Sequence, residues 1–257
     1  MYAAERQRMI VALAHEHDRV SVAELADRFG VTTETIRRDL ELLDERGILQ
    51  RIHGGALPRA TGIFAPELGL VEREGHNIPQ KTAIARRALE YLPAANGSMI
   101  LDAGTTTGQL AALLSDNGPL PTVITNSVAI AALLSGRDAA AVLMLGGRVR
   151  GLTQSVVGAR AAEALSRMRV DVAFVGANGM STQHGFSTPD LDEASVKQAM
   201  VSIARRVVAL VDSSKIGTES LHCFAKLSDV DVLITDDGIT DRVRAEFIEQ
   251  GVEVVVA

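Results

Sequence analysis

Residues 21–40 read SVAELADRFGVTTETIRRDL, and this stretch decides how the first part of the chain folds. Ser21 followed three residues later by Glu24 is the pattern of a capping box, which predicts that a helix begins here. Gly30 predicts where that helix ends, because glycine readily adopts the left-handed conformation that terminates a helix. A second helical pattern follows almost at once. Two helices joined by a short turn that contains glycine predict a helix-turn-helix.

The second helix of this pair carries the candidate DNA contacts. It begins at Thr32 or Thr33 and is predicted to run to about Arg46, with an apolar stripe that faces the core. Asp39 lies near the core-facing edge, so we expect a structural role for it. Side chains in the N-terminal half of a recognition helix reach base edges, where an arginine contacts guanine or phosphate; both roles stay open for each arginine. The candidates are Thr33, Thr35, Arg37 and Arg38.

Two short extended segments then predict a wing. Residues 48–52 and 56–58 flank His53-Gly54-Gly55, and a glycine pair between extended segments is typical of a tight hairpin. In a wing behind a helix-turn-helix, Arg51 and His53 can contact phosphate or the minor groove. An apolar stripe over residues 9–14 predicts a preceding helix. Residues 1–58 are therefore predicted to form a winged helix-turn-helix of the α+β class.

Composition and charge restrict the class of protein. The formal net charge of −6 argues against a general nucleic-acid coat protein. The first 58 residues hold eight Arg and no Lys against ten Asp and Glu, so the DNA prediction rests on where the arginines lie. Cys223 is the single cysteine, so no intramolecular disulfide can form. Because no apolar run has membrane length and no signal-peptide pattern is present, we expect a cytoplasmic protein that contacts no membrane.

The pattern changes after a linker predicted over residues 59–75, which holds one proline and three glycines and shows weak periodicity. A helix is predicted from about residue 78, and apolar strands and helices then alternate. The alternation predicts a mainly parallel sheet covered on both faces over residues 76–257. Strands are predicted at 99–102, 122–125, 141–145, 170–175, 207–211, 230–235 and 252–256. Helices are predicted at 108–114, 127–134, 159–168, 192–205 and 242–250.

Small, polar or cationic residues follow these predicted strands. In open parallel sheets the ligand lies beyond the carboxyl ends of the strands. The first strand leads into Asp102-Ala-Gly104-Thr-Thr-Thr107-Gly, and a helix follows. Backbone N–H groups and the helix dipole of such a loop favour an anion, although an ordinary strand-to-helix turn uses the same residue types. The ends of later strands carry Asn126, Arg148, Asn178 and Lys215.

These segments resemble the DeoR-type family of bacterial regulators of sugar metabolism. The N-terminal resemblance rests on residues 21–40, above all Thr-Ile-Arg-Arg-Asp-Leu at 35–40, and on His-Gly-Gly-Ala at 53–56. It covers nearly the whole chain apart from the linker. The matching segments of the larger domain are Asp102-Ala-Gly-Thr-Thr-Thr107, Thr125-Asn126, Gly146-Gly147, Gly176-Ala-Asn-Gly179, Glu193-Ala-Ser-Val-Lys197 and Asp212-Ser-Ser-Lys-Ile-Gly217.

The resemblance implies an effector domain similar to ribose-5-phosphate isomerase, a Rossmann-like three-layer sandwich, and a phosphorylated sugar as effector. Carried over, the loop at 104–107 holds the phosphate and the polar strand ends lie near the sugar. Glu193 and Lys197 are one helical turn apart, so they could pair; they support the pocket or touch the ligand. The ligand-binding candidates are Asp102, Gly104, Thr105, Thr106, Thr107, Asn126, Arg148, Asn178, Glu193, Lys197 and Lys215.

These patterns favour a repressor of a carbohydrate-catabolism operon that a phosphorylated sugar releases from DNA. We expect operator DNA to be bound by a homodimer or tetramer, because two half-sites supply the affinity. A sugar-phosphate isomerase-like enzyme is the alternative, with Asp102, Asp212, Glu193 and Lys215 as possible acid–base groups. The isomerase has an acidic run where this chain has Gly176-Ala-Asn-Gly179, which weakens that alternative.

Two other kinds of protein are disfavoured. A module that only binds other proteins explains neither the wing nor the loop at 104–107. The histidines form no spaced set of metal ligands with Cys223, so we expect no metal, and we expect no cofactor and no catalytic residue.

Overall fold

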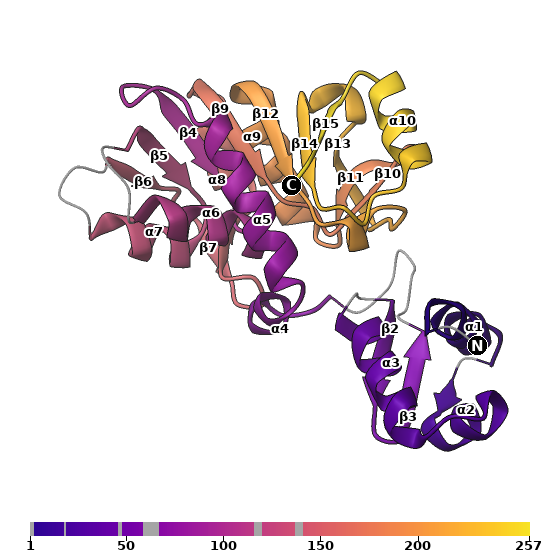
Figure 1. The fold of residues 1–257 in the computed structure, drawn as a ribbon. Coiled ribbons are helices and arrows are strands. Elements are labelled where there is room, and N and C mark those ends of the chain that lie inside the picture. Colours follow the sequence, from indigo (N-terminus) through magenta and orange to yellow (C-terminus); the bar gives the residue numbers. More distant parts are fainter. Residues whose placement is uncertain (1–2, 18, 46–47, 59–66, 116–119, 137–140) are drawn as a thin grey trace. The chain divides into compact units, whose positions relative to one another are not determined.

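The computed structural model divides into two compact units, Met1–Thr61 and Gly62–Ala257 (Figure 1). Each unit has its own hydrophobic core. The structure describes residues 3–17, 19–45, 48–58, 67–115, 120–136 and 141–257. Most of the predicted linker, 59–66, therefore lies outside the described residues, as does the predicted end of the recognition helix at residues 46 and 47.

The first unit consists of three helices and a small antiparallel sheet. The helices are α1 (Ala3–His17), α2 (Val22–Phe29) and α3 (Thr33–Glu45). The sheet has the order β1 (Val20–Ser21), β3 (Gly55–Pro58) and β2 (Leu49–Ile52). The predicted helix-turn-helix and wing hairpin are thus confirmed. Their core is aliphatic and includes the fully buried side chains of Ile10, Ile36, Leu40 and Leu49.

The ends of the helix-turn-helix are fixed by the residues that the sequence singled out. The hydroxyl of Ser21 accepts a hydrogen bond from the Glu24 amide at 3.1 Å, which caps α2. Gly30 has φ 62°, the left-handed conformation that ends the helix. The hydroxyl of Thr32 accepts from the Thr35 amide at 3.2 Å, so Thr32 and not Thr33 caps α3.

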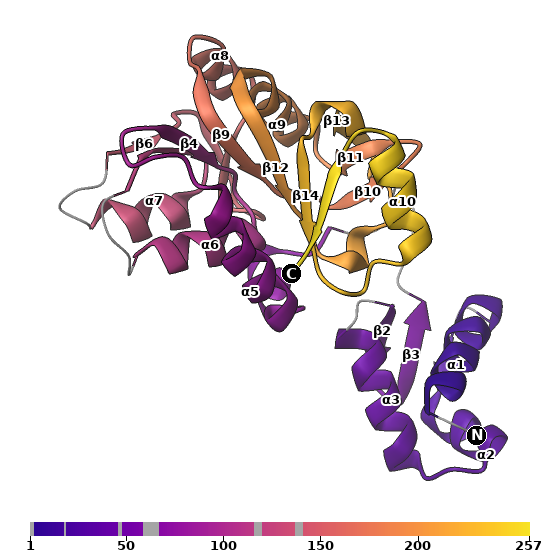
Figure 2. The same cartoon turned by 45° about the horizontal axis from the view of Figure 1, so that its top comes forward.

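The second unit is built on a seven-stranded parallel sheet, whose strands β9, β12 and β14 run side by side in Figure 2. All seven predicted strands form, with ends shifted by up to three residues. Their order across the sheet is β15 (Glu253–Val256), β14 (Val232–Thr235), β12 (Ala204–Leu210), β9 (Val170–Val175), β4 (Ser98–Leu101), β5 (Thr122–Thr125) and β6 (Val142–Met144).

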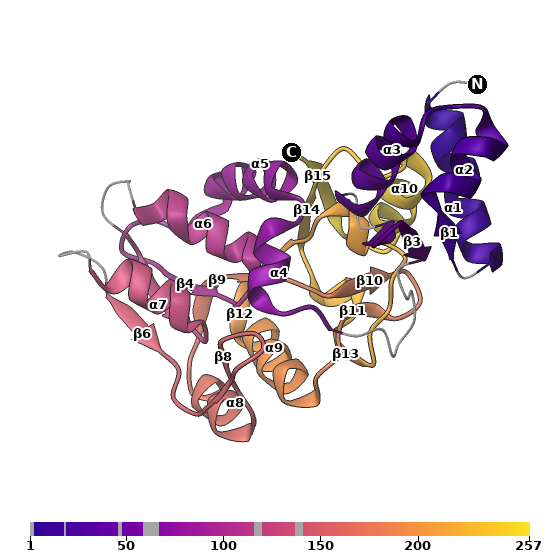
Figure 3. The same cartoon turned by 90° about the horizontal axis from the view of Figure 1, so that it is seen from below.

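Helices cover both faces of this sheet, as predicted for a three-layer sandwich (Figure 3). One face is covered by α5 (Ile78–Ala88), α6 (Thr105–Ser115) and α7 (Val128–Ser135). The other face is covered by α8 (Ala159–Ser166), α9 (Leu191–Ile203) and α10 (Asp241–Glu249). Successive residues of β9 point to opposite faces, so that Phe174 packs with the first group of helices and Val175 with the second. None of the helices among the described residues combines the length and apolar character needed to cross a membrane.

Several short elements were not predicted from the sequence. Helix α4 (Leu70–Gly75) lies within the segment predicted as a linker, and β7 (Arg148–Arg150) pairs with β8 (Ser155–Val157) as a hairpin. A separate antiparallel sheet has the order β10 (Gly179–Ser181), β11 (Gly185–Thr188), β13 (His222–Ala225). Three single-turn 3₁₀ helices occur at Leu89–Tyr91, Ser213–Lys215 and Leu227–Asp229. Segments of three to six residues are too short to show a period in the sequence.

Candidate functional site

The predicted recognition helix α3 exposes its two arginines. The side chains of Arg37 and Arg38 are 55% and 79% exposed. Their guanidinium groups lie 3.5 Å and 3.9 Å from the carboxylate of Glu34. Ion pairs at such distances on an exposed surface contribute little to stability, so both arginines can exchange Glu34 for a phosphate or a base edge. Thr33 is also exposed, and the Thr35 hydroxyl lies 2.9 Å from that of Thr32.

A buried ion pair fixes the recognition helix against α1. The carboxylate of Asp39 accepts from Arg6 Nε at 2.5 Å and from Gln7 Nε2 at 2.8 Å. Arg6 and Asp39 are both buried, so the charges depend on each other. The structural role expected for Asp39 is confirmed. The sequence did not reveal its partner, since Arg6 lies more than 30 residues away in the chain.

The wing residues lie on the surface. Arg51 is on β2, with Nη1 3.6 Å from Glu41 Oε1, and its amide donates to Asp44 Oδ1 at 3.2 Å. His53 is exposed in the turn next to Gly54, whose φ is 81°. Both side chains are available to a partner, and their contact with DNA stays a prediction.

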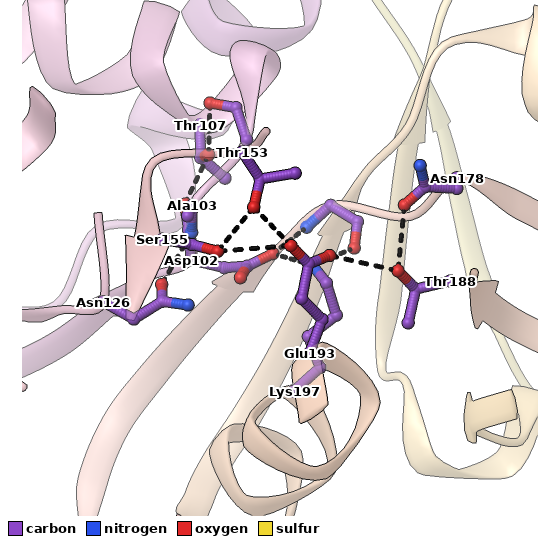
Figure 4. A network of polar contacts seen from close by, with 12 residues as sticks. Asp102, Ala103, Thr107, Asn126, Thr153, Ser155, Asn178, Thr188, Glu193 and Lys197 are labelled. Carbon is purple, nitrogen blue, oxygen red and sulfur yellow. Dashed lines mark hydrogen bonds and ion pairs between the residues drawn. The ribbon is translucent and has the colours of Figure 1, made fainter. Parts of the chain in front are cut away.

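The second unit brings polar residues together at the carboxyl edge of its sheet (Figure 4). Strands β5, β4, β9 and β12 are neighbours, so the residues that follow them meet at one edge. Asn126 follows β5, and its side-chain oxygen accepts from the Ala103 amide at 2.8 Å. Asp102 follows β4, and its Oδ2 accepts from the Gly176 amide at 3.0 Å. The expected convergence of these strand ends is therefore present.

A buried carboxylate and ammonium form the centre of this group. Lys197 of α9 donates to Asp102 Oδ2 and, at 3.0 Å, to the carbonyl of Gly176. Its ammonium also lies 5.3 Å from the centre of the Phe224 ring. Burial raises the pKa of the Asp102 carboxyl, and the charge of Lys197 limits that rise. The second oxygen of Asp102, Oδ1, is buried and has no hydrogen-bond partner among the described residues.

Glu193, one turn earlier on α9, is held by hydroxyl groups from other elements. Its Oε1 accepts from Thr153 at 2.5 Å and from Ser155 at 3.2 Å. Its Oε2 accepts from Thr188 at 3.3 Å, and the same hydroxyl lies 3.1 Å from Asn178 Oδ1 (Figure 4). The pair that Glu193 and Lys197 could have formed is not the one observed. Lys197 takes Asp102 as its partner, because the buried carboxylate at the end of β4 lies within its reach.

The loop at 104–107 opens α6. The hydroxyl of Thr107 donates to the carbonyls of Asp102, at 2.6 Å, and Gly104, at 2.9 Å, so it has a structural role. Helix α6 begins at Thr105, and the first amides of a helix have no acceptor within it. Gly104 and Thr105 are partly exposed, while Thr106 is buried. Phosphate binding by this loop stays a prediction.

A second charged group lies where α4 and α5 meet the end of β12. Lys81 of α5 is buried and donates to the carbonyl of Arg73. Burial lowers the pKa of Lys81 to about 8; Asp212 opposes this, whereas the cations of Lys215 and Arg73 add to it. Asp212 also accepts from Asn77 Nδ2 at 3.0 Å. We call Arg73, Lys81 and Lys215 the cation group.

The cation group has an excess of positive charge and contains residues that sequence reasoning missed. Three cations stand against the two carboxylates of Asp212 and Glu74. Arg73 Nε and Nη2 are buried and have no hydrogen-bond partner among the described residues. A signal for Lys81 was present in the sequence, since it shares the buried stripe of α5 with Ile84 and Ala85. A lysine on such a stripe indicates a special environment.

The arginines of β7 behave differently from each other. Arg148, the predicted ligand contact, is 60% exposed and pairs with Asp192 Oδ2 at 2.6 Å. Arg150, two residues on, is only 18% exposed and lies 3.3 Å from Glu193 Oε1. A ligand contact by Arg148 stays a prediction, whereas Arg150 contacts the site directly. In the part of the chain that the structure describes, no group of His, Cys, Asp and Glu could hold a metal ion.

Comparison with known proteins connects both units to one family. Residues 6–59 match the DeoR-like helix-turn-helix domain, and residues 76–237 match the DeoR C terminal sensor domain. The HTH-type transcriptional regulator GlpR of Haloferax volcanii is 40% identical, with 99% of this chain and 98% of that protein covered. The HTH-type transcriptional repressor GlcR of Bacillus subtilis is 33% identical, with 92% and 89% covered.

A third regulator and one solved structure are also similar to this chain. The glycerol-3-phosphate regulon repressor of Escherichia coli is 30% identical, with 92% of each chain covered. Ribose 5-phosphate isomerase A of Methanocaldococcus jannaschii is 17% identical over 55% of each chain with a TM-score of 0.41, which is too low to carry a conclusion. The two domain matches and the full-length relatives agree. The chain belongs to the DeoR family of helix-turn-helix transcriptional regulators.

Proposed function

We propose that this regulator represses a carbohydrate-catabolism operon and that a phosphorylated sugar releases it from operator DNA. The observation that carries the proposal is the pairing of two features at one sheet edge. The cation group, three cations near two carboxylates, lies where α4 and α5 meet the end of β12, and a buried acceptor without a partner among the described residues, Asp102 Oδ1, follows β4. A small molecule with a phosphate at one end and hydroxyl groups at the other matches both features.

The cation group is our proposed attractor of the phosphate. Arg73, Lys81 and Lys215 outnumber the carboxylates of Asp212 and Glu74, and the excess positive charge attracts a phosphate group. The N–H groups of Arg73 that have no partner among the described residues supply donors of the planar guanidinium kind that bind phosphate oxygens. The loop at 104–107 offers neutral donors, its amides and the hydroxyls of Thr105 and Thr106. The experiment below therefore also tests its predicted role as the phosphate cradle.

The acceptors at the end of β4 are our proposed contacts for the sugar hydroxyls. Asp102 Oδ1 is buried and has no partner in the described part of the chain, and an ionised carboxylate accepts hydrogen bonds from hydroxyl groups. The hydroxyl of Thr188 contacts both Glu193 and Asn178, so these two further polar groups lie together at the same edge of the sheet. Six-carbon sugar phosphates, fructose 1-phosphate among them, and polyol phosphates all carry suitable hydroxyls. The relative from Escherichia coli is named for glycerol 3-phosphate.

We propose that the site senses and does not catalyse. Isomerisation needs a general base beside the carbon acid. Asp102 is tied to Lys197 and the Gly176 amide, and Glu193 receives several donors, so neither is positioned as a free base. An assay for aldose–ketose isomerisation should show no turnover. Turnover that Asp102→Asn abolishes would overturn this proposal.

The partners follow from the proposed function. We propose a homodimer or tetramer, because one reading helix per chain makes two half-sites necessary for tight binding. Binding of a prokaryotic chromosome also implies that the protein acts in the cytoplasm.

Calorimetry tests the effector directly. A panel of sugar phosphates and the matching free sugars is titrated into the purified protein. We expect one phosphate ester to bind and its free sugar not to. Lys81→Met should weaken binding more than Thr105→Ala if the cation group holds the phosphate. A larger loss in Thr105→Ala would assign the phosphate to the loop, and binding of no ester would contradict the proposal.

A further inference from the structure

We propose that the Arg150–Glu67 ion pair transmits effector binding to the segment that leads to the DNA-binding unit. Glu67 is the first described residue after 59–66, the stretch that follows the wing in sequence. We call residues 67–75, which include α4, the connector. The inference rests on the proposed function, because it concerns how that site regulates DNA binding.

Arg150 is placed between the connector and the candidate effector site. Its Nη2 lies 2.6 Å from Glu67 Oε2, while its Nη1 lies 3.3 Å from Glu193 Oε1. Its Nε lies 3.1 Å from Asp190 Oδ2, next to the start of α9. One guanidinium therefore contacts the connector and the carboxylate proposed to receive the sugar. A change at Glu193 reaches Glu67 through a single side chain.

The burial of Glu67 makes this contact consequential. The Glu67 side chain is only 7% exposed, and its Oε1 is buried without a hydrogen-bond partner among the described residues. A buried carboxylate is strongly destabilised when its ion-pair partner moves away. The position of the connector is therefore sensitive to the position of Arg150.

The β7–β8 hairpin makes a second link between the same two places. The carbonyl of Leu152 accepts from the Leu70 amide at 2.9 Å, which attaches the start of α4 to the hairpin. Thr153 and Ser155, on the same hairpin, both donate to Glu193. The hairpin thus holds Glu193 on one side and the connector on the other.

The mechanism follows from competition for the oxygens of Glu193. Thr153, Ser155 and Arg150 share Oε1, and a sugar hydroxyl that donates to Glu193 competes with them. When Arg150 loses its contact with Glu193, its guanidinium remains paired with Asp190 and Glu67 and can shift toward them. Differential contacts of this kind are what a ligand needs to shift a conformational equilibrium.

Glu67→Gln tests the proposal in the full-length protein. It removes the charge and keeps the size of the side chain. For the wild type we expect the effector to weaken operator binding about 100-fold, and for Glu67→Gln less than about tenfold. Effector affinity, measured by calorimetry, should stay within about threefold of wild type, because Glu67 is not a proposed ligand contact. Substitution of a purely structural residue would not change the ratio of operator affinities with and without effector.

Glu72→Gln is the matched control. Glu72 also lies in the connector, and among the described residues it accepts from the Gly69 amide, at 3.0 Å, a bond that the side-chain oxygen of Gln can also accept. In Glu72→Gln, the ratio of operator affinities with and without effector should remain that of the wild type. A ratio in Glu67→Gln equal to wild type would overturn the proposal, and so would loss of effector binding in that variant. Should Glu67→Gln not fold, Glu67→Asp, which shortens the side chain, takes its place.

Hydrogen exchange separates this inference from the proposed function. Without any effector, amides of residues 69–75 should exchange faster in Glu67→Gln than in wild type. Unchanged exchange would overturn the link between Arg150 and the connector, whatever the effector. If the wild type binds no phosphate ester, the proposed function is wrong, and the exchange result alone decides whether this ion pair holds the connector.

Discussion

The arginines of α3 and the charged groups at the carboxyl edge of the parallel sheet are held in opposite ways. Arg38 is 79% exposed, and its guanidinium lies 3.9 Å from the carboxylate of Glu34. Lys197 is 6% exposed and pairs with a carboxylate that is itself buried. Exposed charges can bind a partner without supporting the fold, whereas buried charges serve the ligand and the fold together. Mutations in the two regions should therefore have different consequences.

The largest expected effect is on folding at the sheet edge. Lys197→Met leaves the buried carboxylate of Asp102 without its counter-ion, which should cost about 3–5 kcal/mol of unfolding free energy. Urea unfolding measures the loss. Adding Asp102→Asn removes the unpaired charge, so the double variant should recover part of it. A loss under about 1 kcal/mol in Lys197→Met would show that the pair does not support the fold.

Removal of the exposed arginines should weaken DNA binding and leave the stability almost unchanged. We expect Arg37→Ala and Arg38→Ala each to weaken operator binding by about 1–3 kcal/mol. The free energy of unfolding should change by less than about 0.5 kcal/mol, and effector binding should not change. Arg242→Ala, on α10, is the control, since Arg242 pairs with Glu246 as Arg38 pairs with Glu34. Unchanged operator affinity in both arginine variants would remove them from the interface.

The titration of Lys81 should appear in effector binding. Its pKa is lowered to about 8, so the amine is charged below pH 8 and loses its proton as the pH rises through 8. A bound phosphate favours the charged form, so binding takes up a proton near this pH. Affinity should fall from pH 7 to pH 9, at most about tenfold per unit. Calorimetry should show a flat profile for Lys81→Met, and an equally steep profile there would assign the proton to another group.

The smallest expected effect is that of a helix cap in the first unit. Ser21→Ala removes the acceptor for the Glu24 amide and should cost about 1 kcal/mol of stability. Thermal unfolding measures this cost, and operator affinity extrapolated to the fully folded population should be unchanged. A loss of operator affinity that the smaller folded fraction does not explain would show that α2 does more than support α3.

The same comparison explains what the sequence could reveal. For α3, spacing along one helix separates Ile36 and Leu40, which are buried, from Arg37 and Arg38, which are exposed. Helix periodicity alone therefore predicts which residues of α3 are exposed and able to contact DNA. The parallel sheet was equally predictable, because its strands are short and rich in apolar residues and alternate with helices.

The sheet edge was predicted only in part. Strand order brings Asp102, Asn126 and Gly176 together, and the rule for parallel sheets anticipates this. The partners of Glu193 come instead from the β7–β8 hairpin and β11, elements too short to leave a pattern. Arg150 and Glu67 are 83 residues apart, so only the folded structure shows their contact.

Release of the protein from DNA by a phosphate ester tests the central claim most directly. The full-length protein is bound to DNA from upstream of its own gene and the neighbouring genes at a fixed salt concentration, because such binding depends on salt. Sugar phosphates and their free sugars are then added in turn. Our account predicts specific binding that one phosphate ester weakens and its free sugar does not. Tighter binding at saturating ester, or no specific binding under any condition, would contradict it.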